Sequence, residues 1–460
     1  MKKLGGVWMH NHHKNTANSA PQIMPIPTEV RLPMSMHSGT PAKPIVAVGD
    51  YVKVGQVIGE AVGFVSSPVH ASVSGTVKSI DGLDSITGEK AVSITITSDG
   101  KQELWEGIAP PKVTNLAEFL EAVRNSGVVG LGGAGYPTAP KFTLKESVKL
   151  DYILVNGAEC EPYITSDTRT MVDDTDLLWE GVLLMKEYLK PKNIIVCIEN
   201  NKPQPIKKIK ALCEGKEGIS VRVLPTLYPQ GERKVLVYNV TGRIVPEGGR
   251  LPDVGCIVVN CTTVAVFTRY IKTGIPLVSR CVTVDGPAVK RPCNIIAPIG
   301  SSVRYLLDFC DKQPIDEKSK LPIDEKYKLL IDGQLSNNVK KIIMGGPMMG
   351  LAIPSIDLPI VKITSAILAF TAKTALPPEP SPCIRCGRCL SRCPMSLMPP
   401  NIENAYELKK PELLKKFKVN MCAECACCAY TCPAKRPLVQ VMILAKDMLY
   451  NYEKAKKEAK

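Results

Sequence analysis

The sequence lacks features that are typical of several classes of protein. Aromatic residues make up only 5% of the 460 residues, and the formal net charge of +14 is not gathered into a dense basic run, so a nucleic-acid-binding protein is not favoured. No apolar run approaches the roughly 18 residues of a membrane span. The basic start MKKLGGVWMHNHHK has no apolar segment behind it. We therefore expect a cytoplasmic protein that does not itself cross the membrane.

Hydrophobic residues and cysteines are plentiful. Hydrophobic residues account for 45% of the chain, and its length suggests about two to four domains. In a reducing compartment the seventeen cysteines should be buried side chains or metal ligands, because disulfides are rare there. Nine of them fall within residues 383–432. The other eight lack ligand spacing, and we expect most of them to be core residues.

Two copies of the pattern C-x2-C-x2-C-x3-C-P stand in this cysteine-rich segment, as CIRCGRCLSRCP and CAECACCAYTCP. This is the spacing of bacterial two-cluster ferredoxins, in which three close thiolates bind one [4Fe-4S] cluster and the fourth reaches the other. The predicted ligands are Cys383, Cys386, Cys389 and Cys432 for cluster one, and Cys422, Cys425, Cys428 and Cys393 for cluster two.

A zinc site is the alternative for these cysteines. Structural zinc sites use four ligands in two pairs and seldom leave further cysteines at a fixed offset, so the doubled motif favours iron and sulfur. Cys427, a ninth cysteine inside the second motif, is expected to be a packed thiol. Nearby basic side chains would offset the negative charge of the clusters. They are Arg385, Arg388, Arg392, Lys435 and Arg436.

A glycine-dense stretch, VVGLGGAGYPTAPK, occupies residues 128–141. Its glycines fit G-x-G-x-x-G, but a dinucleotide fingerprint should follow a strand and open a helix. Here NLAEFLEAVRNSG, which precedes it, predicts a helix, and Pro137 follows directly. The motif match alone is therefore weak. Such a loop still lets backbone N–H groups approach an anion, with Lys141 at its end, and a plain glycine turn is the alternative.

The stretch from about 112 to 270 predicts an α/β layer. The apolar run in DYILVNGAECEP predicts a strand that ends in polar residues, and NIIVCIEN, ISVRVLP and CIVVNC predict further strands. Between them, DTDLLWEGVLLMKEYLK predicts a helix with Asp174 as a plausible N-cap. Open α/β sheets bind ligands at the carboxyl ends of their strands. PQGERK and NCTT add polar residues that taken alone could be turns or caps.

The motifs GLGGAGYPTAPK, VNGAECEPYIT, PQGERK and GGPMMG, followed by the doubled cysteine motif, closely resemble the RnfC family of Rnf electron-transport complexes, over nearly the whole chain. The α/β part more distantly resembles the flavin-binding subunit of respiratory complex I, which has an acid where this chain has Ala158. The resemblance implies an FMN held by the glycine loop with NAD(H) beside it. The positions implied for FMN are Gly132, Gly133, Gly135, Lys141, Asn156, Asn260 and Thr263. Those implied for NAD(H) or for closing the pocket are Tyr136, Glu159, Glu161, Gly231 and Glu232.

The expected fold class is multi-domain α/β plus β. Residues 45 to 80 resemble a lipoyl or biotinyl carrier, but the hairpin tip GFVSSP lacks the carrier lysine. RCVTVDGPAV and KIIMGGPMMG fit a small β-grasp module, and LPPEPSP has the composition of a stiff linker. The expected parts are an N-terminal segment (1–28), a barrel-sandwich hybrid (29–105), an FMN/NAD(H)-binding α/β domain (110–270), a β-grasp SLBB-like module (271–350), a connecting segment with the Pro-rich linker (351–382), a two-[4Fe-4S] ferredoxin-like domain (383–445) and a basic C-terminal tail (446–460). The histidines of WMHNHH (His10, His12 and His13) have no assigned role.

The cofactors together predict a function. Hydride transfer moves two electrons and an iron–sulfur cluster accepts one, so a flavin is needed between NAD(H) and the clusters. The resemblance implies a peripheral subunit on the cytoplasmic side of the cell membrane, in a complex that couples NAD(H) and ferredoxin redox to ion transport. Its partners would be the other Rnf subunits, both membrane subunits and a ferredoxin-like subunit, with ferredoxin reached indirectly, no nucleic acid, and membrane contact only through partners. The alternatives are a stand-alone flavin and iron–sulfur NADH reductase, such as a propanediol-utilisation cobalamin reductase, and a non-catalytic electron relay.

Overall fold

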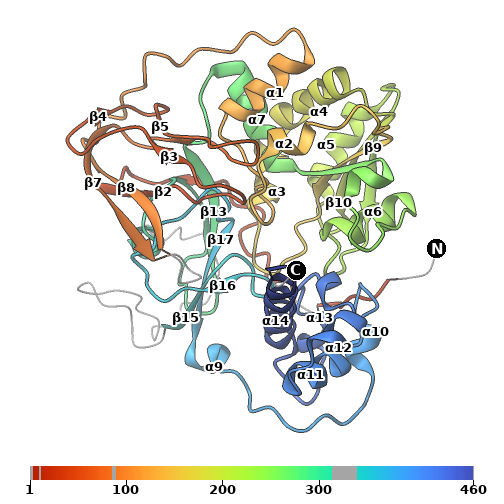
Figure 1. The fold of residues 1–460 in the computed structure, drawn as a ribbon. Helices are drawn as coiled ribbons and strands as arrows, with labels where there is room; N and C mark the ends of the chain where they lie inside the picture. Colours follow the sequence, from red (N-terminus) through yellow and green to blue (C-terminus); the bar gives the residue numbers. More distant parts are fainter. Residues whose placement is uncertain (1–3, 10–11, 85–89, 313–338, 459–460) are drawn as a thin grey trace.

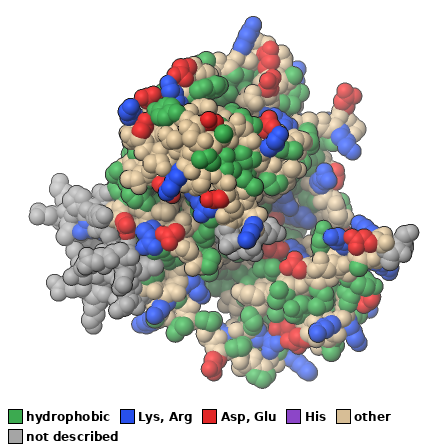
Figure 2. Space-filling view, turned by 60° about the vertical axis from the view of Figure 1, so that its left-hand side comes forward, with side chains coloured by type: hydrophobic (Ala, Val, Ile, Leu, Met, Phe, Trp, Pro, Cys, Tyr) green, Lys and Arg blue, Asp and Glu red, His purple; other side chains and the backbone are tan. Residues whose placement is uncertain are grey.

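The computed structural model describes residues 4–9, 12–84, 90–312 and 339–458. His10 and the middle of the expected β-grasp module lie outside these ranges. Figure 1 shows the N-terminal strands on the left, the α/β domain at the upper right and the C-terminal helices below it. Figure 2 shows basic and acidic side chains interspersed over one face. No helix in the described ranges is long and apolar enough to cross a membrane.

The N-terminal domain consists of two small sheets. The larger has the order β2-β8-β7-β4 and the smaller β3-β5-β6, and all of their pairings are antiparallel. Core residues such as Leu32, Ile94 and Ile96 are fully buried, and residues 93–96 of β8 are buried on both sides of the strand. The strands are β2 (Glu29–Pro33), β3 (Lys43–Pro44), β4 (Tyr51–Val52), β5 (Val57–Glu60), β6 (Val69–His70), β7 (Gly75–Asp84) and β8 (Lys90–Ser98).

Four parallel strands form the sheet of the α/β domain, in the order β11-β10-β9-β12. They are β9 (Tyr152–Gly157), β10 (Asn193–Glu199), β11 (Ile219–Leu224) and β12 (Cys256–Asn260), which confirms the strands expected here. The chain places β10 and β11 on one side of β9 and then returns to pair β12 with the other side. Ligands bind outside the carboxyl ends of the strands at such a reversal of strand order. Asn156 and Asn260 are paired across it.

Helices cover both faces of this sheet because its strands are apolar on both sides. Ile153 and Val155 share a core with Val182 of α4, whereas Leu154 shares a core with Leu236 of α6 on the other face. The helices are α1 (Leu116–Asn125), α2 (Thr138–Phe142), α3 (Ser166–Asp173), α4 (Thr175–Leu189), α5 (Pro203–Cys213), α6 (Arg233–Thr241), η1 (Leu251–Val254) and α7 (Cys261–Thr273).

One local prediction in this domain, the N-cap at Asp174, is confirmed in position but not in its hydrogen bond. Asp174 does stand at the N-cap position of α4, but its side chain makes no capping hydrogen bond. Its carboxylate instead accepts a hydrogen bond from the Arg269 guanidinium of α7 at 2.9 Å. An ion pair with a neighbouring helix takes the place of the side-chain capping hydrogen bond.

A six-stranded sheet of order β1-β14-β13-β17-β15-β16 follows the α/β domain. Its helix α8 (Val303–Lys312) packs on β13 and β14. The sheet extends past residue 350, because β17 pairs with both β13 and β15, and it includes a strand of the N-terminal segment, β1. The strands are β1 (Gln22–Ile23), β13 (Ser279–Asp285), β14 (Cys293–Pro298), β15 (Val339–Met344), β16 (Leu351–Ala352) and β17 (Ala366–Thr371).

The C-terminal part is helical and surrounds the two cysteine motifs. Each motif ends in a single-turn helix, α10 or α13, and α11, α12 and α14 pack together around a core that includes Ile402, Leu414 and Met442. The chain from Leu376 to Gly387 has no regular structure, as its prolines predict. The helices are α9 (Ala372–Ala375), α10 (Arg388–Ser391), α11 (Pro399–Glu407), α12 (Pro411–Lys416), η2 (Val419–Met421), α13 (Cys427–Tyr430) and α14 (Leu438–Glu458).

Candidate flavin pocket and cysteine centres

The glycine loop is anchored to the start of α7 by Thr263. The fully buried Thr263 hydroxyl accepts a hydrogen bond from Leu131 N at 3.0 Å and donates one to Val129 O at 3.1 Å. The loop runs between α1 and α2 and so follows a helix, as expected. Thr263 is thus held close to the loop, and both hydrogen bonds of its hydroxyl go to the protein backbone.

Asn260 lies directly against the glycine loop. Its side chain caps α7 by accepting from Thr263 N at 3.1 Å, and it donates to Asp167 at 2.7 Å. A Cβ atom added to Gly132 would lie 2.7 Å from Asn260 Nδ2, so only glycine permits this approach. Nothing lies within 4 Å of the corresponding position at Gly133. The loop therefore leaves open space on one side and packs tightly on the other.

Asp167 orients this amide, and no motif in the sequence indicated it. Its second carboxylate oxygen accepts from the Thr262 hydroxyl, at 2.6 Å. Asp167 lies 93 residues from Asn260 in the chain, in the first turn of α3. Only the three-dimensional fold brings the two together, so no local pattern could have predicted the contact.

Asn156 and Gly231 face each other across the carboxyl edge of the sheet. Asn156 Nδ2 donates to Gly231 O at 3.0 Å, and Asn156 Oδ1 accepts from Ala158 N at 3.1 Å. A Cβ atom on Gly231 would lie 3.5 Å from Cys160 Sγ. The short side chains of Ala158 and Cys160 therefore line this edge, where the resemblance predicts the flavin.

Two cationic side chains lie beside the glycine loop. Lys141 Nζ is 3.5 Å from the position of a Cβ atom on Gly130, and Arg233 stands at the start of α6. Burial, with the charge of Arg233 as a second cause, lowers the pKa of Lys141 to about 8. A pair of cations next to a glycine-rich loop suits an anionic group such as a phosphate.

The carboxylates expected near NAD(H) bind backbone N–H groups of the chain. Glu159 accepts from Asp167 N and Thr168 N at the first turn of α3. Glu161 accepts from Met348 N at 3.0 Å and Met349 N at 2.9 Å, in the GGPMMG stretch. Their role as NAD(H) contacts stays a prediction.

Three predicted positions remain: Glu232, Tyr136 and Gly135. Glu232 is the N-cap of α6, and its carboxylate accepts from the N–H groups of Lys234 and Val235. Burial raises the pKa of Glu232. Tyr136, a residue that is 37% exposed, and Gly135, with φ +68°, complete the glycine loop.

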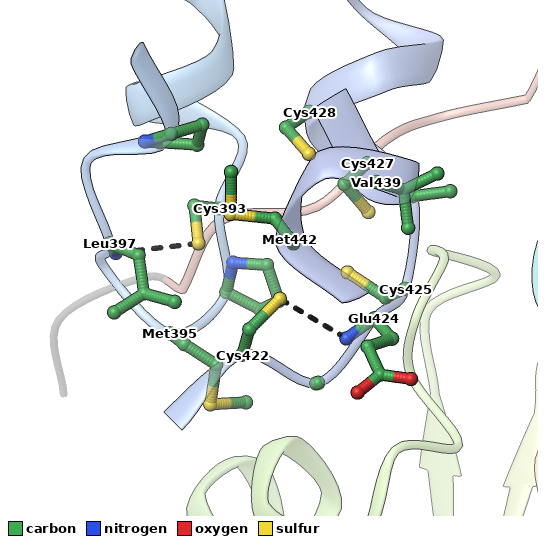
Figure 3. Close-up of a pocket in the computed structure, with 14 residues that line it drawn as sticks. Cys393, Met395, Leu397, Cys422, Glu424, Cys425, Cys427, Cys428, Val439 and Met442 are labelled. Atoms are coloured by element: carbon green, nitrogen blue, oxygen red, sulfur yellow. Dashed lines mark hydrogen bonds between the residues drawn. The ribbon is translucent and has the colours of Figure 1, made fainter. Parts of the chain in front are cut away.

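The cysteines predicted for cluster two line one cavity (Figure 3). Three of them, Cys422, Cys425 and Cys428, come from the second motif, and Cys393 comes from the first. Val439 and Met442 of α14 add apolar walls. Backbone N–H groups point at two of the sulfurs, from Leu397 to Cys393 and from Glu424 to Cys422, both at 3.4 Å. Such N–H···S contacts help to set the potential of a bound cluster.

The cysteines predicted for cluster one lie nearer the surface. Cys389 is close enough to Cys432 and Cys383 for their charges to raise its pKa, after the larger effect of burial. Cys383 and Cys386 are exposed. The fourth cysteine of each motif is thus on the side of the other motif's cysteines, as the ferredoxin spacing predicts.

The thiols of the cluster-two cysteines line a cavity and are not gathered around a single point. Among the described residues, no three His, Cys, Asp or Glu side chains are close enough to hold a single metal ion.

The cluster-two cavity adjoins the α/β domain. Cys427 is fully buried and lines the cavity, and its Sγ lies 3.9 Å from Tyr228 O, just before PQGERK. Cys425 shares an apolar cluster with Cys160 and Tyr228 and lies within the electrostatic reach of Glu232. The predicted flavin pocket and the predicted cluster two are therefore neighbours.

Comparisons with known proteins place the two N-terminal domains in known classes. Residues 123–269 match the Nuo51 FMN-binding domain of the complex I 51K class, and residues 1–101 match the RnfC barrel sandwich hybrid domain. The chain therefore joins a barrel-sandwich hybrid to a flavoprotein domain of the complex I class, as its sequence predicted.

Full-length relatives identify the family. The chain is 39% identical over 398 residues to the C subunit of the proton-translocating ferredoxin:NAD(+) oxidoreductase complex of Clostridium ljungdahlii, covering 86% of this chain and 82% of that protein. It is 36% identical over 404 residues to the Na(+)-translocating counterpart of Acetobacterium woodii, covering 86% of each. The chain belongs to the RnfC family of ion-translocating ferredoxin:NAD(+) oxidoreductase (Rnf) complexes.

Similarity to solved structures is lower. An NAD+-reducing [NiFe]-hydrogenase in its air-oxidized state aligns with a TM-score of 0.45 and 14% identity, over 73% of this chain and 53% of that chain. This level of similarity is too low to support an argument about function.

Proposed function

We propose that this chain is the subunit through which an Rnf complex exchanges electrons with NAD(H). Electrons would pass between NAD(H), FMN and two [4Fe-4S] clusters, and the whole complex would couple this transfer to ion translocation and ferredoxin redox. The membrane subunits and a ferredoxin-like subunit are the proposed partners. The proposed location is the cytoplasmic side of the membrane, with attachment only through those partners.

One observation supports this proposal most directly: the cavity lined by the four cluster-two cysteines adjoins the loop after β11 of the α/β domain. Cys427 contacts Tyr228, and Gly231 and Glu232 follow a few residues later. Electron transfer needs cofactors to be close together. The packing of the two domains brings their proposed sites together without a separate mobile carrier.

The residues at the carboxyl edge of the sheet fit FMN. Gly132 packs against Asn260, Gly133 leaves open space beside the loop, and Lys141 and Arg233 offer positive charge for a phosphate. Bound FMN would accept the hydride of NADH and release its electrons one at a time. The chain's own residues bind and orient the cofactor, and the apolar contact around Tyr228 excludes water between the two sites.

The burial of the cysteines gives the two clusters different roles. Cluster two lies against the α/β domain, so it would take electrons from the flavin side. Cluster one includes the exposed Cys383 and Cys386, so it would exchange electrons with a partner protein. We also assign the C-terminal helices to a two-cluster ferredoxin-like domain and the six-stranded sheet to an SLBB-like β-grasp module.

Anaerobic purification tests the proposal. Iron, acid-labile sulfide and flavin are measured on one sample, which is then titrated with NADH and followed by visible absorbance and EPR. We expect about eight iron atoms and one flavin per chain, and bleaching of the flavin followed by signals of reduced clusters. Zinc in place of iron, or a bound flavin that NADH never reduces, would reject the proposal.

A further inference from the structure

The ammonium group of Lys14 lies against the loop that follows β9, residues 158–164. Its Nζ is 2.8 Å from Glu159 O and 2.9 Å from Glu161 O, and it also contacts Ile164 O. The side chain is 16% exposed, and the Glu159 carboxylate stands 4.0 Å away. Lys14 belongs to the N-terminal segment, more than 140 residues away in sequence. An ammonium group with three carbonyl acceptors fixes the direction of those carbonyls.

A second buried ammonium group, that of Lys202, holds the start of the same loop. Its Nζ donates to Ala158 O at 2.8 Å, and to Glu199 and Asn201, each at 3.0 Å. The side chains of Lys202 and Glu199 are 3% and 0% exposed. Each lysine is thus paired with a carboxylate, so the two pairs add little net charge. Their effect on the loop comes from hydrogen bonding.

These contacts also fix the direction of two N–H groups. A trans peptide unit points its carbonyl and its N–H in opposite directions. Because the carbonyls of Ala158 and Glu159 face the ammonium groups, the N–H groups of Glu159 and Cys160 point to the other side of the loop. In the described parts of the chain neither N–H has an acceptor. Glu159 has φ +46°, a left-handed conformation that a non-glycine residue keeps only when its surroundings enforce it.

The other side of the loop borders the flavin pocket. Cys160 Sγ accepts from Gly231 N at 3.4 Å, and a Cβ atom on Gly231 would lie 3.6 Å from Ala158 Cβ. Consecutive N–H groups next to a left-handed residue form a small concave donor site. The loop therefore presents donors on the pocket side and acceptors on the lysine side.

We propose that Lys14 and Lys202 are positioning residues of the flavin pocket, which aim the N–H groups of Glu159 and Cys160 at an acceptor on the flavin ring. This inference rests on the proposed function. Accepting a hydride adds negative charge to the ring, and preorganised donors stabilise the reduced form more than the oxidised form. Removing either ammonium group should therefore weaken FMN binding and make the flavin midpoint potential more negative.

The test uses the full chain, purified without oxygen, in the variants K14M, K202M and K14R. FMN affinity is measured by fluorescence quenching during reconstitution, and the midpoint potential by spectroelectrochemical titration. K14M and K202M should bind FMN about tenfold more weakly, as expected for lost hydrogen bonds to a charged group. The matched control is K207M, because Lys207 is exposed on the neighbouring helix α5. It should behave as the wild type.

K14R keeps the charge, but a planar guanidinium cannot reproduce the three carbonyl contacts of an ammonium group. It should fold and shift the potential in the same direction by a smaller amount, so it replaces K14M if K14M is unstable. Iron content should stay at the wild-type value in all variants. Wild-type affinity and potential in K14M and K202M, or an equal loss of iron and flavin, would overturn the inference. A wild-type chain that binds no FMN would instead reject the proposed function.

Discussion

Replacing Cys393 by Ser tests whether the ligation is crossed, with Cys393 binding cluster two. The simpler alternative is that each motif binds its own cluster. Cys393 stands in the first motif, but its side chain lines the cavity of Cys422, Cys425 and Cys428. C393S should therefore degrade cluster two, whereas C386S, in the same motif, should degrade cluster one. Each variant should lose about four of about eight iron atoms, because each cluster holds four. Iron content alone cannot distinguish the two variants. The route by which electrons reach the remaining cluster can.

The distinguishing measurement is reduction by NADH, followed by rapid-freeze EPR. The cavity proposed for cluster two lies next to Tyr228, so C386S should keep a cluster that NADH reduces at the wild-type rate. In C393S the remaining cluster is the exposed one, beyond the vacated site, and its reduction should be slower by at least tenfold. Dithionite, which acts from solution, should reduce the remaining cluster in both variants. Equal reduction of both variants by NADH would refute the crossed ligation and the order of the clusters.

Three other predictions follow from the pocket and its surroundings. G132A should weaken FMN binding, because its Cβ would lie 2.7 Å from Asn260 Nδ2 and would displace the glycine loop; a reconstitution titration in which G132A binds FMN as the wild type does would contradict this. Burial raises the pKa of Glu161 to about 7 from its usual 4.5, so its contribution to stability is complete below about pH 4.5 and is lost as the pH rises to 7. Thermal unfolding of E161Q should show a weaker loss of stability over this range, and an unchanged pH profile would exclude Glu161 as the cause. C427A should keep the full iron content of the wild type, since Cys427 Sγ contacts Tyr228 O, and a loss of iron would make it a ligand.

The features set by local pattern were predictable from sequence. Hydrophobic runs located all four strands of the α/β sheet, and the fixed spacing of the cysteines was enough to group Cys393 with the second motif. These signals need only neighbouring residues, because strand periodicity and ligand spacing are local properties. Most cysteines outside the motifs are buried, as expected for small apolar side chains.

The features set by long-range contacts were not predictable. Asp174 stands at the N-cap position of α4, but its side chain pairs with Arg269 and does not cap the helix, and Asp167 orients Asn260 from 93 residues away. A single sequence gives no sign of such pairs. Glu159 is a further example. Its motif predicted a binding site, but not that its carboxylate would accept a hydrogen bond from the first turn of a helix.

The N-terminal segment had no assigned role, and its contacts now give it one. Gly5 packs against the backbone of Cys393, Val7 forms a β-bridge with Tyr228, and Lys14 holds the loop after β9. Farther along, β1 joins the six-stranded sheet. The N-terminal segment therefore contacts a predicted cluster ligand, the predicted flavin pocket and the six-stranded sheet.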